Sequence, residues 1–140
     1  MTFLALVVTN TAASQQRADT EQCFSSAAGF GERVEACTRL IEAGGTSDRK
    51  LAELLIRRAT ALTGARRFHD AVRDADDAFE RNSAYAPAWA IRTLALGELG
   101  ETEKALASAN RFLTLSPGVP GHYMIRGRVH FDTGRLDLAL

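Results

Sequence analysis

Apolar residues recur every three to four positions over most of this chain, which is the spacing of one face of an α-helix. They predict two consecutive helices, one carrying Leu51, Leu54, Leu55, Ala59 and Leu62 and the next Ala71, Val72, Ala75, Ala78 and Phe79. Pro87 and Gly100 bracket a third helix, because proline suits a first helical turn and glycine a helix end. Thr102 is expected to cap a fourth helix, which Ser116-Pro117-Gly118 ends.

The helical pattern repeats with a period of 34 residues. Small residues recur at this offset at Ala71, Ala105 and Ala139, and large residues at Leu55, Trp89 and Tyr123. Where antiparallel helices cross closely, a small residue must face a bulky one. The period divides the chain into units of about 52–85 and 86–119, followed by 120–140, which stops within its second helix. We expect this incomplete unit to leave Tyr123 and Val129 uncovered, and therefore to fray or to self-associate.

These residues resemble the tetratricopeptide-repeat family, in which a large aromatic residue, a glycine, an alanine and a closing proline recur. The matching positions are Leu55, Ala59, Ala71 and Ala78 in the first unit, Trp89, Gly100, Ala105 and Pro117 in the second, and Tyr123, Gly127, Gly134 and Ala139 in the third. The first unit departs from the pattern, because Arg66 replaces the glycine between the helices and Ser83 replaces the proline. The resemblance implies an all-α fold, a right-handed solenoid of antiparallel helix pairs over residues 49–140.

The residues before the repeats fall into two segments. Residues 1–19 contain a six-residue apolar run, Phe3–Val8, and no charge before Arg17, as in a secretory signal peptide or a disordered tail. This run is too short to cross a bilayer as a helix. Residues 20–48 are expected to form a divergent helix pair that caps the array. Together the two segments resemble exported bacterial tetratricopeptide proteins, which implies a periplasmic or secreted protein; without export, the chain would be cytoplasmic.

The two cysteines, Cys23 and Cys37, lie 14 residues apart in the expected capping pair. Residues at this separation on paired helices can face each other, and export would favour a disulfide between them. The alternative is two buried free thiols. A zinc site is not expected, because there is no Cys-x-x-Cys pair and the three histidines, His69, His122 and His130, are scattered.

Charged residues also recur at the repeat period, at Arg58, Arg92 and Arg126. Each arginine either pairs with groups of a neighbouring repeat, which is the interpretation we favour, or contributes to a basic ladder for an acidic ligand. A cluster of aspartates follows the first of them, at Asp70, Asp74, Asp76 and Asp77. With basic residues nearby, we expect this cluster to be a solvated, mutually paired surface and not a metal site.

The inner groove of the solenoid is the candidate binding surface. In family members that bind chaperone C-termini, lysine and asparagine on successive first helices hold a carboxylate. The candidate groove residues at matching positions here are Ile56, Arg57, Thr60, Ala90, Ile91, Leu94, Met124 and Arg128. They include no such pair, so the resemblance does not extend to carboxylate binding of that kind. We expect a largely apolar groove that suits an apolar or amphipathic helix, or a following helix of a longer chain.

Charge balance and the motifs present reduce the range of functions that the sequence supports. The chain has 17 basic and 17 acidic residues, so no basic surplus exists to bind nucleic acid. It contains no phosphate-binding glycine loop, paired-histidine metal motif or Gly-x-Ser-x-Gly elbow, so we expect neither an enzyme nor a cofactor. The sequence therefore predicts a non-catalytic scaffold that binds a peptide or helix of a partner protein. The alternative is an accessory or regulatory domain of a longer protein with a separate enzymatic or signalling part.

Overall fold

The computed structural model describes residues 2–118, 123, 127–128 and 130–131 of the chain. In this part the elements are six helices, with no strand. They are α1 (Thr2–Phe24), α2 (Phe30–Ala43), α3 (Asp48–Gly64), α4 (Phe68–Arg81), α5 (Ala86–Glu98) and α6 (Thr102–Leu115). None of the helices is long and apolar enough, within these residues, to cross a membrane.

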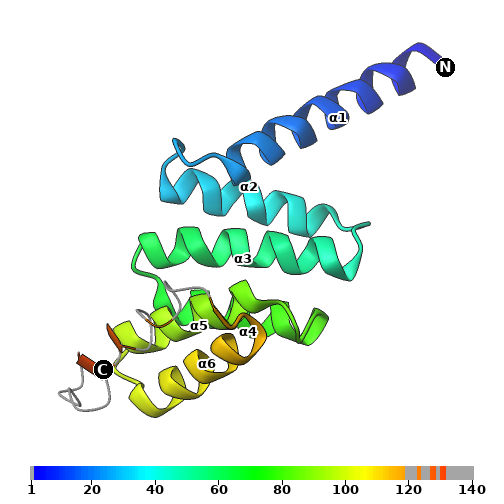
Figure 1. The fold of residues 1–140 in the computed structure, drawn as a ribbon. Coiled ribbons are helices and arrows are strands. Elements are labelled where there is room, and N and C mark those ends of the chain that lie inside the picture. The colour runs from blue at the N-terminus through cyan, green and yellow to red at the C-terminus, as the bar shows by residue number, and fades with distance from the viewer. Residues whose placement is uncertain (1, 119–122, 124–126, 129, 132–140) are drawn as a thin grey trace.

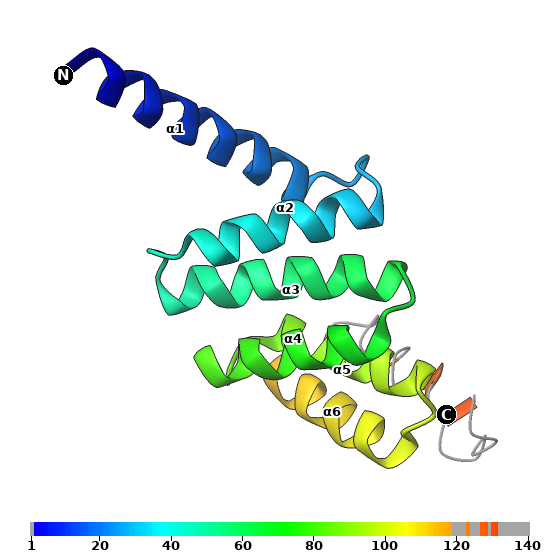
Figure 2. The same cartoon turned by 180° about the vertical axis from the view of Figure 1, so that it is seen from behind.

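Each helix packs against the next one along the chain, so that the helices form an elongated stack (Figures 1 and 2). The pairs α3–α4 and α5–α6 are the two complete repeats, and α2 lies against α3 as α4 lies against α5. The first helices of successive repeats, α3 and α5, also contact each other. The expected all-α solenoid of helix pairs is therefore confirmed.

The N-terminal helix differs from the sequence-based division. α1 runs without a break through residue 19, where we placed the boundary between a signal-like or disordered segment and the capping pair. Its C-terminal end packs on α2, whereas its N-terminal half extends away from the other helices in both views (Figures 1 and 2). The absence of proline and glycine before Gly29 explains why no helix end falls near residue 19. Removal of this segment as a signal peptide stays a prediction.

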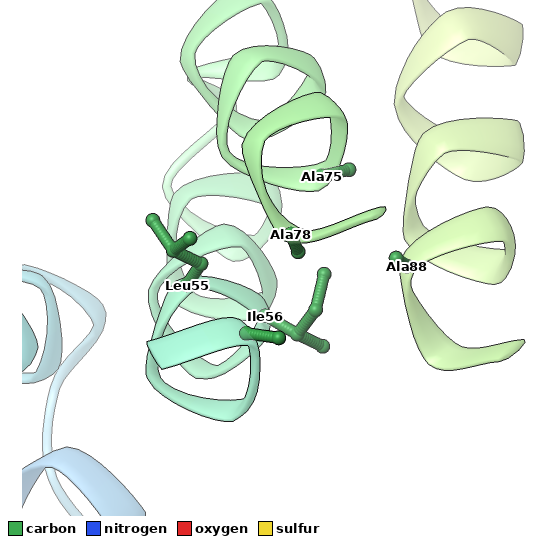
Figure 3. Close-up of a cluster of buried hydrophobic side chains, with 6 residues drawn as sticks. Leu55, Ile56, Ala75, Ala78 and Ala88 are labelled. Atoms are coloured by element: carbon green, nitrogen blue, oxygen red, sulfur yellow. The ribbon is translucent and has the colours of Figure 1, made fainter. Parts of the chain in front are cut away.

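The core of the stack consists of large residues packed against alanines. Leu55 and Ile56 of α3 lie against Ala75 and Ala78 of α4, and Ala88 of α5 completes the cluster (Figure 3). All three alanines are fully buried, which allows the helix backbones to approach closely. At the edge of this cluster the rings of Phe79 and Trp89 stack with their centroids 4.6 Å apart. These contacts join the two complete repeats.

The turns between helices show one expectation that was wrong. The N-cap of α6 is Glu101, whereas Thr102, the expected cap, is the first helical residue. Its hydroxyl group donates to the carbonyl oxygen of Gly100 at 3.5 Å and therefore does not accept a hydrogen bond from the helix. Gly100 has a positive φ of 75°, which L-residues adopt at a steric cost, and this left-handed turn moves the helix start by one residue.

The third unit is described at only a few residues. Tyr123 is 50% exposed, and Gly127 is half-buried. Pro117 follows the end of α6 and is exposed. Met124, Arg126, Val129, Gly134 and Ala139 lie outside the described residues. Fraying or self-association of this unit stays a prediction.

Candidate functional site

The candidate site lies between the first helices of the two repeats. A cavity of about 290 Å³ opens where α3 and α5 end, and its lining combines residues of both helices with the following turn and one residue of the third unit. These residues are Thr63, Gly64, Arg66, Phe68, Leu94, Glu98 and Arg128. The cavity brings together two of the eight predicted groove residues, Leu94 and Arg128. An ion pair between Arg128 and Glu98 connects the third unit to α5 across the cavity.

One of the predicted groove residues is part of the core and not of the groove. Ile56 is only 6% exposed and fills the space between α4 and α5 described above. The small side chains of Ala75, Ala78 and Ala88 leave room there that an isoleucine fills. Ile91 packs against the same cluster and is half-buried. Ile56 is therefore not available to a ligand, and the apolar groove that we expected stays a prediction for the other positions.

The remaining groove candidates lie outside the cavity lining. Arg57 is exposed and its guanidinium carbon lies 4.7 Å from the centre of the Phe24 ring, so it contacts the end of α1. Thr60 is exposed, and its hydroxyl donates to the backbone carbonyl of Ile56. Ala90 is half-buried on α5. Met124 is outside the described residues, so the groove is described at seven of its eight predicted positions.

A second, more polar cavity of about 560 Å³ is lined by Arg49 and Glu53 of α3 and by Asn82 and Tyr85 of the α4–α5 turn. Burial raises the pKa of the Tyr85 hydroxyl, and the negative charge of Glu53 acts in the same direction. Tyr85 therefore remains a neutral hydrogen-bonding group at physiological pH. We did not predict these residues, because no motif or spacing in the sequence groups them.

Gly64, which lines the first cavity, leaves room for the ring of Phe30. A Cβ atom at this position would lie 2.4 Å from the ring of Phe30, which comes from the start of α2. Phe30 is itself 49% exposed, so its ring covers the backbone of α3 and still faces solvent. Any larger residue at position 64 would displace the ring. Glycine at position 64 thus allows the exposed Phe30 ring to lie against the end of α3.

The repeating arginines are bound within the stack. The Arg58 Nε and Nη2 atoms donate to the two carboxylate oxygens of Asp74, both at 2.7 Å, and Nη1 donates to the Thr38 hydroxyl of α2 at 3.1 Å. Hydrogen bonding to the Asp74 carboxylate raises the pKa of the Arg58 guanidinium. Arg92 likewise joins Asp76 of α4 at 2.7 Å to the Ser108 hydroxyl of α6 at 2.6 Å. The structural interpretation is confirmed for both residues; the third arginine lies outside the described residues.

Three of the four aspartates of the cluster, Asp70, Asp74 and Asp76, pair with arginines, as expected, but the cluster is not fully solvated. Asp74 is only 5% exposed, because it lies beneath Arg58. Asp70 accepts from Arg67 at the surface. These residues line a cavity of about 240 Å³ between α2, α3 and α4. Across the described part of the chain, no group of three or more histidine, cysteine, aspartate or glutamate side chains is placed to hold a metal ion.

The end of α1 is held on α2 by a disulfide between Cys23 and Cys37, both fully buried. An ion pair reinforces it, because Arg39 Nε donates to Asp19 Oδ1 at 2.9 Å. This hydrogen bond from Arg39 holds the pKa of the buried Asp19 carboxyl below its usual value. The disulfide is the pairing that the sequence favoured under export.

Solved structures with a similar fold are tetratricopeptide domains. The second TPR domain of the human RPAP3 protein, solved with the HSP70 peptide SGPTIEEVD, is 26% identical, with a TM-score of 0.65 over 71% of this chain and 80% of that one. The first TPR domain of human RPAP3 is 19% identical, with a TM-score of 0.72 over 90% and 94%. MamA is 22% identical, with a TM-score of 0.68 over 79% of this chain and 62% of that one. No family model and no curated protein matches the chain.

Proposed function

Because the chain is a tetratricopeptide-repeat protein in its fold, we propose that it is a non-catalytic scaffold that binds a segment of a partner protein between α3 and α5. The observation that carries this proposal is the cavity that joins Leu94 and Arg128 at the ends of these helices. An apolar wall with charged groups at its rim is typical of peptide-binding sites.

The solved neighbours support a peptide as the ligand class. The second TPR domain of RPAP3 was solved with an HSP70 peptide, and the TPR2B domain of yeast Sti1 with pHsp70. Residues 57 and 60 on α3 are arginine and threonine, so the chain lacks the lysine and asparagine with which family members that bind chaperone C-termini hold a carboxylate. We therefore propose a different peptide, one that contacts apolar residues and arginines.

The site of action that we propose is an oxidising compartment, the periplasm or the exterior. The disulfide between Cys23 and Cys37 supports this proposal, because such bonds persist mainly outside the reducing cytosol. Alkylation of the denatured, unreduced protein tests it, because a protein from an oxidising compartment should show no reactive thiol before reduction.

Site-specific photocrosslinking tests the proposed groove. A photoreactive phenylalanine analogue at Phe68 or Leu94 would line the cavity between α3 and α5, whereas the same analogue at Glu80 or Glu103 lies exposed on α4 or α6. We expect the groove positions to crosslink to one partner, at a single segment identified by mass spectrometry. A synthetic peptide of that segment should abolish the adduct. Equal yields from the α4 and α6 positions, or no competition by the peptide, would reject the groove as the binding surface.

A further inference from the structure

Arg66 has a backbone conformation that arginine rarely adopts. Its φ is +61°, in the left-handed region, and among the described residues it is the one non-glycine residue with a positive φ. The residue 34 positions later is Gly100, with a φ of +75°, at the same turn of the next repeat. The fold therefore requires a left-handed turn here, which glycine would supply without steric strain. The stability of the turn does not explain an arginine at this position.

The side chain of Arg66 contributes to the cavity between α3 and α5. Its guanidinium carbon lies 5.4 Å from the centre of the Phe68 ring, and both residues line the cavity. A guanidinium over an aromatic face keeps its hydrogen-bond donors available at its edge. The ring thus orients the arginine without neutralising it.

The charges around the cavity are unequal. Arg128 is paired with Glu98, and the neighbouring Arg67 with Asp70. Within the described part of the chain, no carboxylate lies within ion-pair distance of Arg66. The described lining thus contains two guanidinium groups, Arg66 and Arg128, and a single carboxylate, Glu98. An anionic group of a ligand would balance the remaining charge.

The apolar part of the lining defines the rest of the ligand. Leu94 and Phe68 of the lining are half-buried, and the exposed ring of Phe30 lies against Gly64, which also lines the cavity. A volume of about 290 Å³ is at the lower end for small-molecule sites and suits one or two side chains of a peptide. An apolar side chain seated there would place the adjacent residue near the guanidinium of Arg66.

We propose that Arg66 is a binding residue for an aspartate or glutamate of the partner segment, next to a large apolar residue that enters the cavity. This proposal rests on the proposed scaffold function and names the chemistry of its ligand. It assigns the strained turn of α3–α4 to binding: the strain persists because the side chain is needed for recognition.

Peptide selection on the wild-type chain supplies the ligand for the test. A phage-displayed library of random short peptides is the probe, and we expect selected sequences to combine a large aliphatic residue with an adjacent aspartate or glutamate. A selected peptide and its version with the acid replaced by the amide are then titrated against Arg66→Gly and Arg66→Ala. Both substitutions should weaken binding of the acidic peptide about tenfold and leave the amide peptide unaffected.

The thermal stability of the two variants separates the role of the Arg66 side chain from that of its backbone conformation. Arg66→Gly should unfold at the same temperature as the wild type or higher, because glycine accepts the left-handed turn, and Arg66→Ala should unfold at a lower temperature than Arg66→Gly. Equal binding of the acidic peptide by the wild type and Arg66→Gly would overturn the proposal. Reduced binding by Arg66→Gly that is equal for acidic and amide peptides would also overturn it.

A third variant distinguishes failure of the Arg66 proposal from failure of the proposed scaffold function. Leu94→Trp fills the cavity with a larger side chain, so any peptide that binds between α3 and α5 should lose affinity for it. Peptides that bind Leu94→Trp as they bind the wild type would count against the groove itself. Loss of binding in Leu94→Trp with full binding in Arg66→Gly would reject only the role of Arg66.

Discussion

Individual side chains stabilise this stack by packing and by charge pairing, and Arg58 contributes to both. Its guanidinium links α2, α3 and α4 through Thr38 and Asp74, and only 21% of its side chain is exposed. The 34-residue spacing in the sequence identified this arginine as a repeating feature. It did not identify Asp74 as its partner, because that pairing depends on how α4 folds back over α3.

The Arg58–Asp74 pair is expected to contribute to stability mainly by preventing a buried, unpaired charge. Arg58→Met leaves the Asp74 carboxylate without its bidentate partner, and we expect it to lower the free energy of unfolding by about 3 to 5 kcal/mol. Chemical denaturation monitored by circular dichroism measures the change. The double variant Arg58→Met/Asp74→Leu should recover most of the loss, because it removes both charges together.

An exposed pair in the same region serves as the control. Arg67 and Asp70 form an ion pair whose side chains are 57% and 36% exposed. Arg67→Met should change the free energy of unfolding by less than about 1 kcal/mol. If Arg58→Met and Arg67→Met lower the free energy of unfolding equally, burial does not determine how much an ion pair contributes, and the explanation given for Arg58 is wrong.

Ile56 shows where reasoning from single positions fails. The resemblance to the tetratricopeptide-repeat family placed it in the groove, because it occupies the position of a groove residue on the first helix. In the structure it is buried, since the alanines on α4 and α5 leave a space that its branched side chain fills. Burial depends on the partners across the interface, which one repeat considered alone does not reveal. Leu94, on the next repeat, does reach the cavity.

Among the helices, α1 has the smallest attachment relative to its length. Of its described side chains only Asp19 and Cys23 are buried, and residues 11–18 are all exposed. The sequence predicted a helix around Cys23, as part of the capping pair. It did not predict that this helix extends back through residues 2–19. Small polar and apolar residues without a breaker are compatible with a helix, a tail or a signal peptide, so the pattern alone does not choose among them.

Removal of the disulfide should therefore release α1 and leave the other helices folded. In Cys23→Ser/Cys37→Ser we expect the amides of residues 17–24 to lose protection from hydrogen exchange, while those of α3 to α6 keep theirs. Closing a loop of this length contributes about 3 kcal/mol by constraining the unfolded chain, so the variant should also unfold at a lower denaturant concentration.

Thiol counting provides an independent check on the same bond. Denatured, unreduced protein purified from its native compartment should show no thiols reactive to alkylation, and two after treatment with a dithiol reductant. Two reactive thiols before reduction would contradict the disulfide and the proposed oxidising compartment together. Unchanged protection of residues 17–24 in the serine variant would instead show that the Asp19–Arg39 pair and Phe24 are sufficient to hold α1.

The molecule as a whole is a linear array of helices. The 34-residue period of the sequence predicts this architecture more directly than it predicts any binding site. Every helix-to-helix contact of the described elements joins neighbours one or two positions apart along the chain. The sequence predicted this architecture correctly because the small and large residues of the interfaces recur at a fixed offset. The cavity was less accessible to prediction, because its lining combines a turn, two helix ends and the third unit.

Neighbour-only packing predicts that damage to one repeat remains local. Ala105 is fully buried in a cluster with Leu96 and Leu106, whereas Ala107 is exposed on the same helix. Ala105→Asp places an unpaired charge in that cluster and should cost about 3 to 5 kcal/mol. Hydrogen exchange should then show α5 and α6 losing protection while α2 and α3 retain it, because these helices share no contact with α6. Ala107→Asp should leave all helices protected, and equal loss over α2, α3 and α6 in Ala105→Asp would mean that the array unfolds as one cooperative unit.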